Sequence, residues 1–176
     1  MVATAPPRTF VPQNLDPSDF GQLEPLYRQL LGRPLNSVLD AQQWLADLSE
    51  LTAVVDDYGA RRYIDKSCHT DDPAIEKAFL HFVENVEPKI KPLFFALRKK
   101  LLDSPARSQL SDPPMALLIR KWSADVELFR DENVPLETQV IKINNEYDKL
   151  CGAMVVNFRG KEYTLHATKG YRCTRA

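Results

Sequence analysis

The sequence predicts a mainly α-helical fold, with an antiparallel hairpin of two long helices in a helical bundle and a small β-hairpin near the C-terminus. Two long stretches carry apolar residues at steps of three and four, the spacing of one helix face. Glycine is scarce, at 6 residues against 13 prolines, which disfavours β architectures with many turns. Only after Gly152 does the apolar period change to two.

The chain begins with a Pro-rich leader, residues 1–17, which we expect to be extended over the surface or disordered. A helical domain is expected over residues 18–152. Its first helix closes at Gly32 and Pro34, which are poor helix formers. The apolar face of this helix consists of Leu23, Tyr27, Leu30 and Leu31.

The first arm of the long hairpin is predicted from about residue 37 to residue 66. Asn36 or Ser37 can act as its N-cap, because either side chain can accept a free backbone N–H of the first turn. Gly59 inside this helix costs about 1 kcal/mol relative to alanine. We therefore expect a bend or a close helix contact near Gly59 and Ala60.

The second arm of the hairpin begins at Pro73, with Asp71 or Asp72 as its N-cap, and its apolar residues continue to Leu101. Pro88 and Pro92 interrupt it, and each costs about 3 kcal/mol in a helix interior. A kink or break is expected near residues 86–89.

Two further helices complete the domain, one from Met115 to about Arg130 and one from about Leu136 to Leu150. The apolar stripe of the last helix consists of Leu136, Val140, Ile143, Tyr147 and Leu150. Such stripes are expected to face a core. The side chains expected to anchor the core are Trp44, Phe82, Trp122 and Phe129.

Residues 153–166 predict a β-hairpin that turns at Gly160. Residues 167–176 form a polar tail, for which a truncation, a frame change or added non-native sequence would each be an explanation.

Composition excludes several classes of function. Lys plus Arg total 23 against 24 for Asp plus Glu, so a net charge of −1 leaves no excess positive field for nucleic acid. No apolar run approaches the length of a membrane span, and the N-terminus lacks the apolar segment of a secretory signal. Three cysteines without a C-x-x-C spacing indicate reduced thiols. We expect a cytoplasmic protein with no nucleic-acid or membrane partner.

Catalytic motifs are absent from the sequence. None of the three histidines begins an H-E-x-x-H motif, and no G-x-S-x-G elbow, phosphate loop or dinucleotide fingerprint occurs. A metal site at Cys68 and His69 is a minor alternative to a plain interhelix turn. Neighbouring carboxylates such as Asp56 and Asp57 are expected on solvated faces. No catalytic, cofactor-binding or metal-ligating residue is assigned.

Three segments nevertheless resemble one family. Residues 44–72, 76–105 and 127–165 are similar, in order and spacing, to the N-terminal region of oligoendopeptidase F-like zinc peptidases of the thimet class. The resemblance covers about residues 20–166. It implies a zinc endopeptidase that cuts short peptides inside a channel enclosed by helices.

The resemblance assigns no active-site residue to this chain, because the family's H-E-x-x-H and later glutamate belong to a C-terminal catalytic half that this sequence lacks. We therefore expect the channel-wall portion of such a metallopeptidase, inert by itself, whose full-length protein would need zinc, short peptides and that catalytic half. The alternative is a stand-alone helical module that binds a peptide or protein without catalysis.

Overall fold

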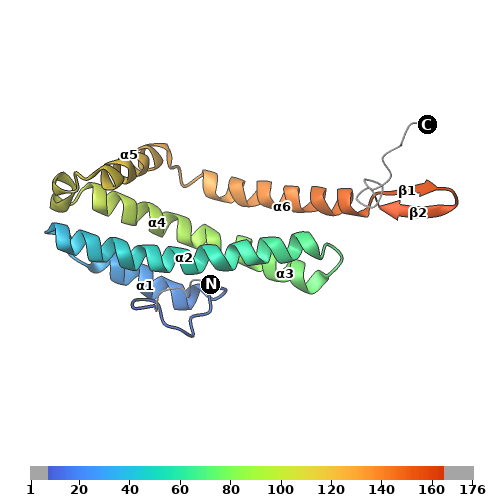
Figure 1. Ribbon diagram of the computed structural model, residues 1–176, viewed down its shortest axis with the longest axis horizontal. Helices are drawn as coiled ribbons and strands as arrows, with labels where there is room; N and C mark the ends of the chain where they lie inside the picture. Colours follow the sequence, from blue (N-terminus) through green and yellow to red (C-terminus); the bar gives the residue numbers. More distant parts are fainter. Residues whose placement is uncertain (1–7, 165–176) are drawn as a thin grey trace, which may run out of the picture.

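The computed structural model describes residues 8–164 and confirms the mainly helical class with a two-stranded sheet near its C-terminal end (Figure 1). The elements are α1 Phe20–Gly32, α2 Val38–Cys68, α3 Pro73–His81, η1 Phe82–Val86, α4 Glu87–Leu102, η2 Pro105–Gln109, α5 Pro113–Leu128, α6 Asn133–Ala153, β1 Val155–Phe158 and β2 Lys161–Thr164. The predictions for residues 1–7 and for the tail 167–176 lie outside the described residues.

The long hairpin is confirmed, since α2 runs antiparallel to the continuous run of α3, η1 and α4 (Figure 1). Ser37 and Asp40 form a reciprocal capping box at the start of α2. The carboxylate of Asp72 accepts the N–H groups of Ala74 and Ile75 at the start of α3. Local capping therefore determines where both arms begin.

The predicted break is a single π-helical turn, η1, directly before Pro88. The N–H of Glu87 bonds to the carbonyl of Phe82, five residues back. The wider turn relieves the clash that the ring of Pro88 would make with the carbonyl four residues back. Pro92 remains inside α4.

The core lies between α1, α2 and α4, with η2 and one face of α5 closing it. Trp44 is 1% exposed, its indole N–H donates to the carbonyl of Leu30 at 2.9 Å, and its ring meets Trp122 edge to face. Phe82 and Trp122 are also buried, as expected. The expectation for Phe129 is wrong: it is half-buried and stacks on Phe95, because α5 ends at the margin of the core.

The described part of the leader, residues 8–17, packs against α2. The carboxylate of Glu50 accepts the backbone N–H groups of Thr9, Phe10 and Val11. Val11 is buried in the core cluster. Part of the core therefore lies before residue 18.

Helix α6 departs from the expected packing. Its apolar stripe faces outward, with Ile143 63% and Leu150 67% exposed. The other members of the stripe, Leu136, Val140 and Tyr147, are exposed as well. The pattern correctly predicts the helix, but the expectation that its stripe faces a core is wrong because no described segment covers that face.

The β-hairpin follows α6 and projects beyond it (Figure 1). β1 and β2 pair antiparallel, with Val155 opposite Thr164. The turn has two residues, Arg159 and Gly160, both at positive φ (54° and 75°), as in a type I′ turn. The predicted turn at Gly160 is confirmed.

Candidate functional site

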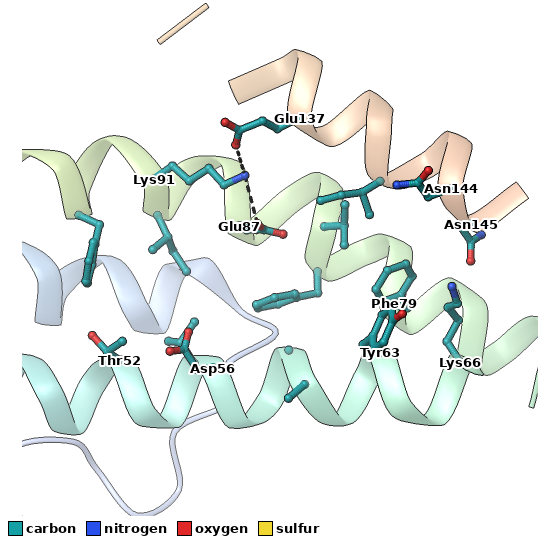
Figure 2. Close-up of a pocket in the computed structure, with 18 of the residues that line it drawn as sticks. Thr52, Asp56, Tyr63, Lys66, Phe79, Glu87, Lys91, Glu137, Asn144 and Asn145 are labelled. Carbon is teal, nitrogen blue, oxygen red and sulfur yellow. Dashed lines mark hydrogen bonds and ion pairs between the residues drawn. The ribbon is translucent and has the colours of Figure 1, made fainter. Parts of the chain in front are cut away.

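A groove of about 950 Å³ lies between α2 and α6 in the described part of the chain. Helices α2 and α6 form its two walls, and α3, η1 and α4 form its floor (Figure 2). The lining combines aromatic rings, charged groups and the two amides Asn144 and Asn145.

Small residues on α2 allow a close contact with the neighbouring helical run beside the groove. Gly59 and Ala60 both line it, and a Cβ on Gly59 would lie 3.0 Å from Cε1 of Phe82. The Phe82 ring therefore packs directly on the backbone of α2, with its centroid 5.3 Å from that of Tyr58. This is the close helix contact expected near Gly59 and Ala60.

Charged side chains hold α6 beside the rest of the protein. Four ion pairs join it to α2, α3, η1 and α4: Lys66–Asp148 at 2.9 Å, Lys149–Glu76 at 2.8 Å, Lys142–Glu84 at 2.6 Å and Lys91–Glu137 at 2.6 Å. The polar face of α6 thus points toward the body and most of its apolar stripe points away, while Tyr147, at the edge of the stripe, also lines the groove.

Glu76 is the centre of the contact between α3 and α6. Its carboxylate accepts hydrogen bonds from Lys149 and from Nδ2 of Asn145, and these bonds lower the pKa of Glu76. Asn145 is 3% exposed, and its Oδ1 is buried without a hydrogen-bond partner. One end of the groove therefore contains an amide oxygen whose hydrogen-bonding capacity is unused.

Every basic side chain that lines the groove has an acidic partner. Besides Lys66 with Asp148, the ammonium of Lys91 lies 3.1 Å from Glu87 and 2.6 Å from Glu137, and the guanidinium of Arg98 lies 3.1 Å from Asp125. Figure 2 shows the Glu87–Lys91–Glu137 chain, which joins α4 to α6. These pairs leave the groove with no unbalanced cation among its lining residues.

Asp56 is different, because its carboxylate makes no hydrogen bond or ion pair with any described residue. Partial burial in the groove wall raises the pKa of Asp56. Burial, together with the negative charge of Asp56, also raises the pKa of the neighbouring Tyr27 hydroxyl. One turn earlier on α2, Oγ1 of Thr52 is buried and has no partner.

Asp56 was not identified from the sequence, because Asp56 and Asp57 were both expected to lie on a solvated face. Adjacent helix residues point about 100° apart. Asp57 is exposed and pairs with Arg61 at 2.8 Å, whereas Asp56 shares its face with Thr52 and lines the groove. The four-residue step between Thr52 and Asp56 was the available signal.

The residues present do not fit a zinc site. Within residues 8–164, no group of three His, Cys, Asp or Glu side chains is placed to hold a metal ion. Cys68 is an exposed thiol, and His81 is exposed with Nε2 3.2 Å from the carbonyl of Ser18. His166 lies outside the described residues.

Aromatic rings make up much of the lining of the groove. Its lining contains no histidine and no cysteine, so the described side chains there offer no nucleophile activated by an imidazole. The rings of Tyr63 and Phe79 lie 6.3 Å apart beside the buried Lys66, and Phe95 stacks on Phe129 at 4.5 Å. Such surfaces suit stacking and hydrogen bonding along a chain.

No helix in the described part of the protein is both long enough and apolar enough to cross a membrane.

The structure is a mainly helical domain with a groove between two of its helices. The family model of the peptidase M3 N-terminal domain matches residues 10–129, about two thirds of the chain. The chain therefore belongs to the peptidase M3 family, as an N-terminal domain. No curated protein and no solved structure matches it.

The matched range ends at Phe129, just before α6 begins at Asn133. It contains the first two of the three segments that resemble the oligoendopeptidases, 44–72 and 76–105. One wall of the groove, α2, and its floor lie inside the match, and the other wall, α6, lies outside it.

Proposed function

We propose that this chain forms one wall of the peptide channel in an oligoendopeptidase F-like zinc endopeptidase that hydrolyses short peptides. The groove between α2 and α6 is the observation that carries the proposal, because an open trough of rings, amides and paired charges suits an extended peptide. Membership of the M3 N-terminal domain family supports the same lineage.

The zinc ligands and the general base would belong to a catalytic half outside this sequence, since the sequence contains no H-E-x-x-H. The proposed role of the chain is to bind and confine the peptide. We place the protein in the cytoplasm, where free thiols such as Cys68 and Cys151 stay reduced.

The outward stripe of α6 supports the existence of a covering partner. Leucine, isoleucine and tyrosine side chains that are more than half exposed along one helix face form an apolar surface of the kind that usually meets another protein segment. In this proposal the catalytic half covers the stripe.

The proposal is tested on the purified chain with two measurements, metal content by mass spectrometry and hydrolysis of a quenched fluorescent oligopeptide. We expect no stoichiometric zinc and no cleavage. Metal-dependent turnover that copurifies with the chain through every step would overturn the assigned role. Sequencing the source DNA beyond codon 176 is a direct complement, since a downstream H-E-x-x-H in any forward frame supports the peptidase lineage.

Dye binding and self-association through the α6 stripe distinguish the channel wall from the alternative, a stand-alone binding module. A channel wall without its catalytic half should bind a hydrophobic dye or self-associate through the stripe, and Ile143→Glu with Leu150→Glu should abolish both. A monodisperse, cooperatively unfolding monomer that binds no dye favours the module.

A further inference from the structure

The charges of the groove do not balance. Its lining carries five carboxylates against three basic side chains, and each basic side chain is already paired. The excess is negative, and Asp56 is the carboxylate that lacks a partner among the described residues. A ligand that enters the groove therefore meets an unneutralised negative charge on the α2 wall.

The position of Asp56 is open to a ligand. Thr52 and Asp56 are one helical turn apart, and Figure 2 shows both side chains directed from α2 into the groove. The next residue on this face is Gly59, where the Phe82 ring packs against the helix backbone. Asp56 itself is exposed, so a cation can reach it from solvent.

The length of the groove fits a short extended chain. Along α2 the lining runs from Thr52 to Lys66, a rise of roughly 21 Å at 1.5 Å per residue. An extended peptide covers that distance with about six residues. Asn145 lies near the Lys66 end of this lining.

From this arrangement we propose that the groove binds an extended peptide of about six residues that carries a basic side chain, and that Asp56 is the counter-ion for its ammonium or guanidinium group. The inference rests on the proposed function in one respect, namely that the ligand is a peptide. The cation site itself depends only on Asp56 and the paired state of the other charges.

Fluorescence anisotropy with labelled hexapeptides tests the proposal on the full chain. One peptide carries a single central arginine, and its matched partner carries glutamine at that position. We expect the arginine peptide to bind about tenfold more tightly, as for a charge-assisted hydrogen bond. Asp56→Asn should remove this preference and leave the glutamine peptide unaffected. Asp57→Asn, next to it on the outer face, is the control and should preserve the preference.

The outcomes separate the cation site from the peptide function. Equal affinity for both peptides, or a preference that survives Asp56→Asn, overturns the cation site and leaves peptide binding intact. If neither peptide binds, agmatine is the probe: binding that Asp56→Asn abolishes supports the cation site and contradicts the peptide function. Failure of agmatine as well overturns both.

Discussion

The body of the protein and helix α6 are held by different forces. In the body, residues 10–129, side chains such as Trp44, Leu51 and Leu97 are almost completely removed from water. Helix α6 has a stripe of similar residues, yet that stripe faces solvent and the helix is attached by ion pairs. An amphipathic helix is thus docked here by its polar face.

Because different forces hold them, the body and helix α6 should differ in their free energy of opening. Burial of a large apolar side chain contributes about 1.5–3 kcal/mol, whereas a solvent-exposed ion pair contributes about 0.2–1 kcal/mol and is weakened by salt. Most pairs that hold α6 have at least one partner with a side chain half open to solvent, such as Glu137 at 55%. Helix α6 should therefore open locally while the body stays folded.

The largest expected effect is the loss of a body anchor. Trp44→Ala removes a side chain that is 1% exposed and breaks its hydrogen bond to the Leu30 carbonyl. We expect the free energy of unfolding to fall by about 3–5 kcal/mol, measured by urea denaturation with circular dichroism. Leu150→Ala on the α6 stripe is the control and should cost less than about 0.5 kcal/mol. A comparable loss in both variants would show that the stripe is buried in solution.

The second-largest expected effect is a difference between α6 and the body in their response to ionic strength. Raising NaCl from 0.05 to 1 M shortens the screening length to about 3 Å and weakens the four pairs that hold α6. A combined loss of about 1.4 kcal/mol would lower the protection of α6 amides about tenfold in hydrogen exchange. Amides of α2 in the body are the internal reference and should keep their protection. A parallel loss in α2 would contradict the separate docking of α6.

A smaller effect is expected from Glu76 alone. Because hydrogen bonds from Lys149 and Asn145 lower its pKa, Glu76 stabilises the docked helix above its unfolded-state pKa of about 4.3. That stabilisation is lost as the pH falls through the folded pKa. We expect α6 protection, corrected for intrinsic exchange, to drop several-fold on acidification in the wild type. Near neutral pH, Glu76→Gln should show lower α6 protection than the wild type and a smaller further drop on acidification, whereas Glu146→Gln, an exposed neighbour, should behave as wild type.

Features that depend on short stretches of chain were predictable from the sequence. The caps at Ser37 and Asp72, the break before Pro88 and the turn at Gly160 each follow from steric and hydrogen-bonding rules that act within a few residues. The structure bears these predictions out with small shifts of boundary.

Features that depend on tertiary placement were not predictable in the same way. The period of Leu136, Ile143 and Leu150 shows that a helix has an apolar face, but it cannot show whether another segment covers that face. Phe129 was expected to be buried on the same local pattern. The groove lies between α2 and α6, so the position of Asp56 in its wall follows only from the packing of both helices.

The smallest expected effect concerns Asp56 and has the opposite sign to the others. Burial raises the pKa of this carboxyl in the folded protein, so its protonated form favours folding and that contribution is lost as the pH rises through the folded pKa. At pH 7 the ionised carboxylate therefore opposes folding, and Asp56→Asn should stabilise the protein by less than about 0.5 kcal/mol, since solvent still reaches the group.

Asp57→Asn gives the matched comparison, because it removes the ion pair with Arg61 and should be neutral or slightly destabilising in the same urea titration. The gain from Asp56→Asn should vanish well below the unfolded-state pKa of about 3.9, where the wild-type carboxyl is protonated in both states. A destabilising Asp56→Asn at pH 7 would mean that the carboxylate already has a favourable partner in the free protein. A stabilising Asp56→Asn at pH 7 would instead agree with a carboxylate that has no partner in the free protein and is available to a cationic ligand.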